Sequence, residues 1–213
     1  MTNEMIRLRA VSKKYTVDDR IVTVFDELDL DINPNEITVL IGKSGCGKTT
    51  LLRMLAGLEK PTSGSIDIPD SLRIGMVFQE PRLMPWLTCE KNVTLGMKNP
   101  SKEDSDNILK LVGLEGFERA YPSQLSGGMK QRAALARTLI RDSNLILMDE
   151  PFAALDNYTR QAMQKELLRI RRETNAGIVF VTHDMTEAIN IGDRIISIRD
   201  NNTEEVQYEK ESN

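Results

Sequence analysis

The segment Gly42–Thr49, with the sequence GKSGCGKT, constrains the fold of this chain more than any other segment. It follows Ile37–Ile41, a continuous apolar run with β-branched residues that is typical of a strand buried on both faces. It leads into Thr49–Leu58, where leucines and a methionine form the broad apolar face of a helix. A buried strand, a glycine-rich loop and a helix in this order open a parallel α/β unit.

The same segment matches the complete G-x-x-x-x-G-K-[ST] pattern of a phosphate-binding loop. Glycines let successive backbone N–H groups face phosphate oxygens, and the positive end of the following helix faces the same anion. We expect Lys48 to reach the β- and γ-phosphates of a nucleotide, the Thr49 hydroxyl to bind Mg²⁺, and Thr50 to add a hydroxyl at the α-phosphate. A glycine turn that binds nothing is the alternative, and the flanking strand and helix argue against it. The predicted nucleotide-binding residues of this loop are Gly42, Lys43, Ser44, Gly45, Cys46, Gly47, Lys48, Thr49 and Thr50.

A second candidate site follows another buried strand. The apolar run Leu145–Met148 ends in Asp149 and Glu150, and ligands of parallel sheets sit beyond the carboxyl ends of the strands. Adjacent carboxylates repel unless they have different partners. We therefore expect Asp149 to hold Mg²⁺ and Glu150 to orient or deprotonate the attacking water. An ordinary acidic strand-to-loop junction is the alternative.

The remaining chain supports an α/β fold. Alternating apolar residues up to Ile32 predict short antiparallel strands. From Pro81 to about Leu125 prolines and a helical pattern indicate an inserted helical segment, with Ser101 as a possible helix N-cap. Beyond it helices and strands alternate: helices are expected at 129–140, 158–172 and 185–191, and strands at 145–148, 178–182 and 194–198. The polar tail Asp200–Asn213 is expected to be mobile at its end.

Composition excludes several classes of protein. The 213 residues carry 28 basic and 32 acidic side chains, a formal net charge of −4 that gives no global attraction to nucleic acid. No apolar run is long enough to span a bilayer, and the N-terminus lacks a signal-peptide pattern. We therefore expect a cytoplasmic protein. Cys46 and Cys89 lack metal-ligand spacing and are expected to stay unpaired.

Leu125–Arg132, with the sequence LSGGMKQR, resembles the signature sequence of the ABC transporter ATPases. Together with the phosphate loop and the acidic pair, this resemblance covers nearly the whole chain. It implies a P-loop NTPase core with a mainly parallel sheet, an N-terminal antiparallel β subdomain and an inserted α-helical subdomain. The expected organisation is one ABC ATPase domain over 1–213, with the helical subdomain at 82–126.

The resemblance also implies roles for single residues. Tyr15 stands where the family stacks an aromatic ring on adenine, Gln79 matches the Q-loop glutamine that approaches Mg²⁺, and His183 matches the switch histidine near the γ-phosphate. The implied catalytic residues are Glu150, His183, Gln79 and Lys48, and the implied further nucleotide contacts are Ser126, Gly127, Gly128 and Asp156. Met129 departs from the commoner glutamine of the signature, and we expect this change to be tolerated.

Ser126–Gly128 begins a predicted helix and so forms a second anion-binding helix start. In the family, such a start meets the phosphate loop of a second subunit, which implies a head-to-tail homodimer with two shared ATP sites. The segment FQEPRLMPWLT from Phe78 to Thr88 resembles the subgroup that serves nitrate, sulfonate and taurine importers. The implied partners are integral membrane permease subunits and, indirectly, a substrate-binding protein, with no nucleic acid. The subunit would then be peripheral at the inner face of the cell membrane, and Arg82–Leu87 is the expected docking surface.

Three alternatives remain open. The chain resembles ABC ATPases of other importers or exporters, although exporters often fuse the ATPase to membrane helices. The ABC ATPases of DNA repair carry long coiled-coil insertions, for which there is no room between Gln79 and Ser126. A nucleotide-gated module without hydrolysis is the third alternative, and the presence of Glu150 and His183 argues against it.

Overall fold

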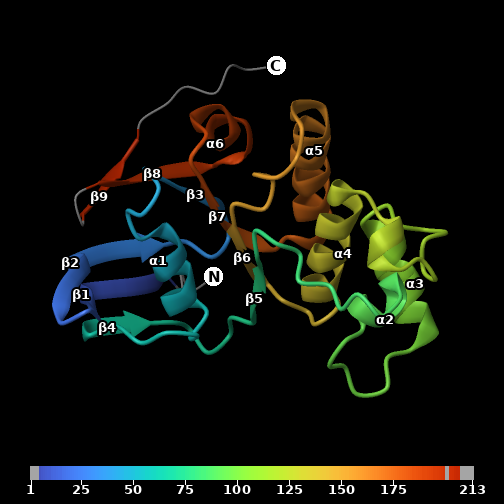
Figure 1. Cartoon of the computed structure of the whole chain (residues 1–213), viewed down its shortest axis with the longest axis horizontal. Coiled ribbons are helices and arrows are strands. Elements are labelled where there is room, and N and C mark those ends of the chain that lie inside the picture. Colours follow the sequence, from blue (N-terminus) through green and yellow to red (C-terminus); the bar gives the residue numbers. More distant parts are fainter. Residues whose placement is uncertain (1–4, 200–201, 207–213) are drawn as a thin grey trace. The chain divides into compact units, whose positions relative to one another are not determined.

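The computed structural model describes residues 5–199 and 202–206. The chain divides into two compact units (Figure 1). The first combines Met1–Leu72 with Gly177–Asn213, and the second is Arg73–Ala176. The first unit holds the phosphate loop, whereas the second holds the acidic pair and the signature segment.

An antiparallel sheet forms one part of the first unit. Its order is β2 (Arg20–Ile32), β1 (Ile6–Val17), β4 (Ser63–Asp67). Asp18 and Asp19 join β1 to β2 with φ angles of 46° and 59°, as a two-residue hairpin turn with both central residues at positive φ requires. The expected antiparallel N-terminal sheet is therefore confirmed, but its first two strands are long rather than short.

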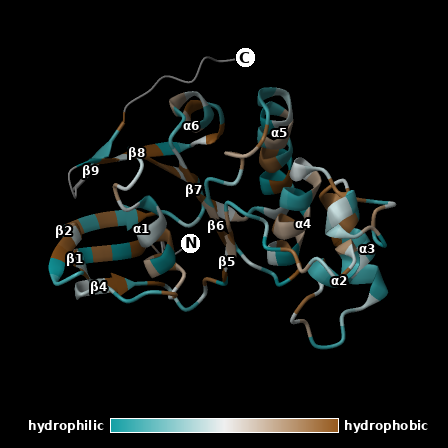
Figure 2. Ribbon diagram, viewed as in Figure 1, coloured by the Kyte–Doolittle hydropathy of each residue, from teal (hydrophilic) through white to brown (hydrophobic). Residues whose placement is uncertain are grey.

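A mainly parallel sheet forms the other part of the first unit. β3 (Ile37–Ile41) pairs in parallel with β7 (Gly177–Thr182) on one side and with β8 (Arg194–Arg199) on the other. Every residue of β3 and β7 is buried, and these strands are largely hydrophobic (Figure 2). Helix α1 (Lys48–Leu55) contacts β7, and α6 (Met185–Ile191) contacts β3.

The C-terminal tail contains a strand that the sequence analysis did not predict. Residues 202–205 form β9 (Asn202–Glu205), which pairs antiparallel with β8. Thr203 lies opposite Ile198, and Glu205 lies opposite Ile196. The strand therefore extends the sheet by one edge position. Residues 200–201 and 207–213 lie outside the described part of the chain.

The second unit combines two parallel strands with helices. β5 (Ile74–Val77) pairs with β6 (Leu145–Asp149). The helices are α2 (Cys89–Val93), α3 (Lys102–Leu111), a short 3-10 turn at Pro122–Gln124, α4 (Gly127–Leu139) and α5 (Asn157–Thr174). α4 contacts α2, α3, α5 and β5, so it is the centre of this unit (Figure 1).

Candidate functional site

The backbone of the phosphate loop depends on its glycines. Gly45 and Gly47 have φ angles of 81° and 102°, which L side chains rarely adopt. A Cβ atom at Gly47 would lie 2.6 Å from Cγ1 of Val24 and 2.7 Å from the Phe25 ring. The loop therefore approaches β2 closely, and α1 begins directly after it at Lys48.

Lys48 is buried, with 5% of its surface exposed. Its Nζ donates to the carbonyl oxygens of Gly42 at 2.7 Å and of Lys43 at 3.0 Å, so the ammonium is held against the loop. Among the described residues Lys48 makes no ion pair with a carboxylate. A buried cation that lacks an anionic partner is costly, and an anion at the loop would offset that cost.

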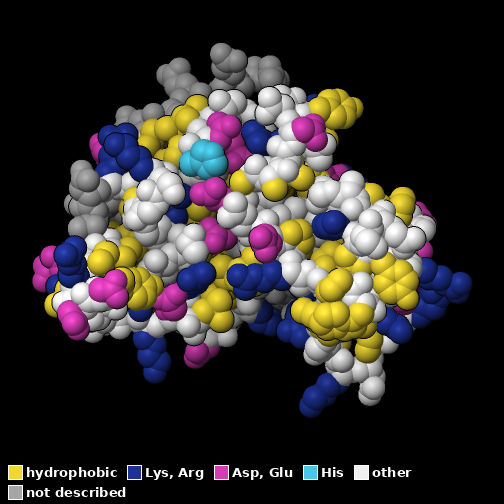
Figure 3. All heavy atoms as spheres, viewed as in Figure 1, with side chains coloured by type: hydrophobic (Ala, Val, Ile, Leu, Met, Phe, Trp, Pro, Cys, Tyr) yellow, Lys and Arg dark blue, Asp and Glu magenta, His cyan; other side chains and the backbone are white. Residues whose placement is uncertain are grey.

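A pocket of about 480 Å³ lies beside the loop. Gly42, Lys43 and Cys46 line it together with His183, which follows β7. The other lining residues come mainly from β8 and the start of α6: Ile41, Met185, Ser197, Ile198 and Arg199. The exposed imidazole of His183, the chain's one histidine, is the cyan side chain in Figure 3. The structure thus brings His183 to the same pocket as the loop, and its catalytic role stays a prediction.

Tyr15 lies in a small polar cluster on the same unit. Its hydroxyl donates to the Glu59 carboxylate, and the Lys13 ammonium lies 4.7 Å from its ring centroid. Burial and the Glu59 contact raise the pKa of Tyr15, while the Thr50 hydroxyl acts in the opposite direction. Tyr15 therefore also interacts with Thr50, the last residue of the predicted loop site. Its predicted stacking on adenine is not tested by these contacts.

The acidic pair lies where β6 ends in the second unit. Asp149 is the last residue of β6 and is 8% exposed. Glu150 follows with a φ angle of 42°, and its carbonyl accepts a hydrogen bond from the Ala153 N–H at 3.2 Å. Positive φ at a non-glycine residue is a strained conformation that is often found at functional sites. The chain thus turns sharply at Glu150.

The signature segment is packed against the start of α5. Ser126 caps α4, and its Oγ accepts a hydrogen bond from the Met129 N–H at 3.3 Å. A Cβ at Gly127 would lie 3.1 Å from Leu155, and one at Gly128 would lie 3.1 Å from Thr159. The glycines therefore allow a close approach of these two helix starts.

Asp156 caps α5, and its Oδ1 accepts a hydrogen bond from the Thr159 N–H at 3.0 Å. The Thr159 contacts hold the pKa of Asp156 below its usual range. In this structure Asp156 is thus a helix cap beside the signature glycines, and its predicted contact with nucleotide remains a prediction.

Gln79 is fixed to α4 through its backbone. Gln131 Nε2 donates to the Gln79 carbonyl at 2.8 Å, and Arg137 donates to the carbonyls of Pro81 at 2.9 Å and Arg82 at 3.0 Å. The helix that Ser126 caps, α4, thus also holds the segment that follows β5. Sequence reasoning gave no role to Gln131 or Arg137. Gln131 was within the signature segment, but no pattern pointed to its carbonyl partner.

The predicted site residues therefore form two sets, each described within its own unit. The loop, Tyr15 and His183 belong to the first unit, and the other predicted residues belong to the second. Sequence reasoning also missed Glu59 and Lys13, which surround Tyr15, because these residues match no motif.

The donors fit ATP with a magnesium ion. The glycine cradle and the buried Lys48 suit a polyphosphate. Within the described ranges no three acidic, histidine or cysteine side chains cluster as a metal cage. Thr49 and Asp149 offer the oxygen donors that Mg²⁺ prefers, and Mg²⁺ usually completes its shell with waters and substrate phosphates.

No helix among the described residues is long and apolar enough to cross a membrane.

Comparisons with known proteins find related chains. A family model described as ABC transporter matches residues 25–153. An uncharacterized ABC transporter ATP-binding protein of Methanocaldococcus jannaschii is 45% identical, covering 90% of this chain and 76% of the relative. An aliphatic sulfonates import ATP-binding protein of Bacillus subtilis is 42% identical, covering 88% of this chain and 77% of the relative. A solved dimeric ATP-binding cassette in a post-hydrolysis state, bound to ADP and Pi, is 32% identical with a TM-score of 0.80, covering 95% of this chain and 99% of that chain.

Proposed function

Because the chain belongs to the ABC transporter ATP-binding family and is an ATPase of that family, we propose that it drives an importer for a small organic anion such as an aliphatic sulfonate. The observation that carries the ATPase part is the buried Lys48 ammonium, which is held on a glycine loop without a carboxylate partner among the described residues. The sulfonate part is supported by the identity to the B. subtilis import protein.

In the proposed reaction the loop N–H groups and Lys48 bind the phosphates of ATP, and their positive charge stabilises the charge that develops on the transferred phosphoryl group. Thr49, Asp149 and Gln79 would hold Mg²⁺. When bound, this ion neutralises charge on the β- and γ-phosphate oxygens. Glu150 orients and deprotonates the attacking water. His183 contacts the γ-phosphate from the loop's pocket, and Tyr15 stacks on adenine.

We further propose that each ATP is shared between two copies of the chain. The α4 start at Ser126–Gly128 offers backbone N–H groups to an anion, and it would face the phosphate loop of a second copy. The dimeric state of the solved cassette supports this arrangement. Asp156 lies beside the signature glycines and would approach the same shared site.

The permease would dock on Arg82–Leu87, at the cytoplasmic face of the membrane. Trp86 is 71% exposed, and hydrophobic side chains gather over this helical part of the second unit (Figure 3). The segment is anchored to α2, because the buried Asn92 side chain donates to the carbonyls of Met84 and Leu87, and to that of the next residue, Thr88. A fixed, exposed tryptophan is typical of a protein interface.

Transport into proteoliposomes tests the proposal. The chain, its cognate permease and the binding protein are reconstituted, and ATP-dependent accumulation of a labelled alkanesulfonate is measured beside ATP hydrolysis. We expect both activities with the wild type, neither with Lys48→Ala, and weaker assembly with Trp86→Ala. Hydrolysis with outward movement of a solute instead would identify an exporter. Absence of ATP cleavage with the complete complex would identify a nucleotide-gated module.

A further inference from the structure

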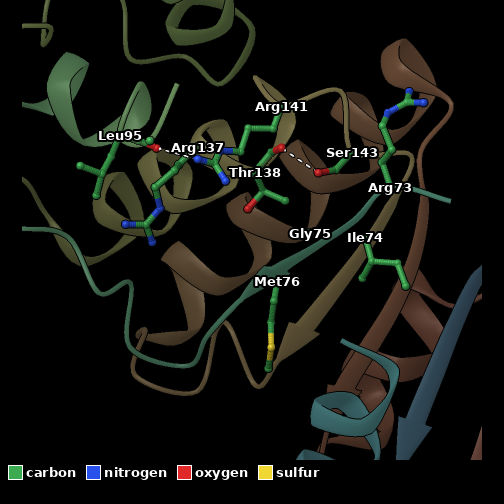
Figure 4. Close-up of a pocket in the computed structure, with 10 residues that line it drawn as sticks. Arg73, Ile74, Gly75, Met76, Leu95, Arg137, Thr138, Arg141 and Ser143 are labelled. Carbon is green, nitrogen blue, oxygen red and sulfur yellow. Dashed lines mark hydrogen bonds between the residues drawn. The ribbon is translucent and has the colours of Figure 1, made fainter. Parts of the chain in front are cut away.

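A second pocket, of about 560 Å³, lies within the second unit, between α4 and β5 (Figure 4). Ile74 and Met76 of β5 line one side of it, and Leu95 lines the end beyond α2. α4 contributes Arg137 and Thr138, and Arg141 follows just after the end of this helix. None of the residues predicted to bind ATP lines this pocket.

The charged side chains that line this pocket are all positive. Arg137 and Arg141 lie one helical turn apart around the end of α4, and in Figure 4 both extend toward the side of Leu95. No acidic side chain lines the pocket, and among the described residues neither arginine forms an ion pair. Burial and the neighbouring Arg141 lower the pKa of Arg137. The isolated unit therefore bears the repulsion of two cations without compensation.

Backbone tethering explains part of this arrangement. Arg137 donates to the carbonyls of Pro81 and Arg82, and Arg141 donates to the Leu95 carbonyl at 3.1 Å. These contacts use two N–H groups of Arg137 and one of Arg141, whereas a guanidinium offers five donors. A neutral amide could make such contacts without the repulsion. The paired positive charge thus points to an anionic occupant.

We propose that this pocket receives a carboxylate side chain from the cytoplasmic segment of the permease that docks beside Trp86, with Arg137 and Arg141 binding the carboxylate. This inference rests on the proposed permease partner and specifies its chemistry. Arg137 lines the pocket and also donates to the carbonyls of Pro81 and Arg82, so this side chain links the pocket to the start of the docking segment Arg82–Leu87. The aliphatic side chains of Ile74, Met76 and Leu95 would contact apolar residues that flank the acid in the partner. A free inorganic anion would leave these apolar surfaces and most of the volume unused.

The test measures the affinity of the full-length chain for its cognate permease in detergent. Arg141→Gln is the main variant, because Arg141 is exposed and makes a single backbone contact. Arg73→Gln is the matched control, because Arg73 also lines the pocket but its guanidinium extends away from Arg137 and Arg141 in Figure 4 and donates to the Asp142 carbonyl at 2.7 Å. ATP binding by each isolated variant checks that the chain is folded.

We expect Arg141→Gln to weaken permease binding about tenfold or more, and Arg141→Lys to retain much of the affinity. Arg73→Gln should leave the affinity unchanged. Acidic residues in the permease's cytoplasmic loops are then replaced one at a time by arginine. One such replacement should restore the affinity of Arg141→Glu, and this charge exchange would identify the carboxylate.

The inference would be overturned if Arg141→Gln bound the permease with the affinity of the wild type, or if no charge exchange restored binding. In either case, binding of the wild-type chain to the permease would still uphold the proposed partner. Binding of free glutarate that depends on Arg141, without any effect of Arg141 on permease affinity, would assign the pocket to a small anion and overturn it as well. A wild-type chain that does not bind the permease at all would overturn the proposed partner itself.

Discussion

At the scale of single residues, Glu59 links three groups around the predicted adenine-binding tyrosine. It accepts from Tyr15 and pairs with Lys13 at 3.3 Å and Arg53 at 3.4 Å. These contacts, that with Tyr15 foremost, hold the pKa of Glu59 below its usual range. Because the carboxylate is partly exposed, its contribution to stability is modest.

We expect Glu59→Gln to lower the free energy of unfolding by about 0.5 kcal/mol at pH 7. A carboxylate with a depressed folded-state pKa stabilises the protein fully above its unfolded-state pKa of about 4.3, and this contribution is lost as pH falls through the folded-state pKa. Urea denaturation of wild type and variant, repeated at several pH values from about 7 down to about 3, measures the difference between their free energies of unfolding. A difference that grows toward acid would contradict the assignment.

The two cysteines should differ sharply in reactivity. Cys89 is fully buried, and burial raises its pKa to about 11, so little reactive thiolate exists near neutral pH. Cys46 is partly exposed in the phosphate loop. Maleimide labelling of the folded chain, followed by mass spectrometry, should modify Cys46 alone, and ATP should slow the modification. Labelling of Cys89 at a comparable rate would contradict the buried position of α2.

The residues of the candidate site differ in how far the sequence reveals them. Lys48, Asp149 and Glu150 follow from local patterns, because Lys48 completes the glycine-rich loop after β3 and the two acidic residues stand at the end of β6. Glu59, Gln131 and Arg137 do not, because their contacts join segments that are 44, 52 and about 55 residues apart. Such pairings depend on the tertiary fold, which no local spacing encodes.

At the scale of elements, the helix caps give a matched comparison. Ser126 caps α4 and Ser101 caps α3, and both are exposed serines whose Oγ accepts a backbone N–H three residues later. Replacing either by alanine should lower stability by about 1 kcal/mol. Only Ser126→Ala should also weaken ATP-dependent association, because only α4 is proposed to face a nucleotide. Equal effects of the two variants on association would mean that Ser126 acts only as a helix cap.

Most elements could be predicted from periodicity, and the errors have physical causes. The buried strands β3 and β6 and the helix α6 lie within a residue of their expected bounds. α2 has only five residues and no periodic pattern that the sequence could reveal. β9 is polar, and it is a strand because β8 offers it an open edge.

At the scale of the whole molecule, the predicted site residues belong to two compact units of one chain. In the proposed cycle, the signature segment of one copy completes the phosphate loop of another. The organisation of residues 82–126 as a helical subdomain within a single ATPase domain stays a prediction. The central claim is therefore that catalysis needs two copies of the chain with ATP between them.

The solution mass of Glu150→Gln, with and without Mg-ATP, tests that claim most directly. The glutamine keeps the size of the side chain but cannot take a proton from water, so hydrolysis should fall about a hundredfold or more while ATP stays bound. We predict that ATP doubles the mass of this variant, and that adding Ser126→Ala diminishes the doubling. A mass that stays that of one chain at saturating ATP, both alone and with the permease present, would contradict the shared site.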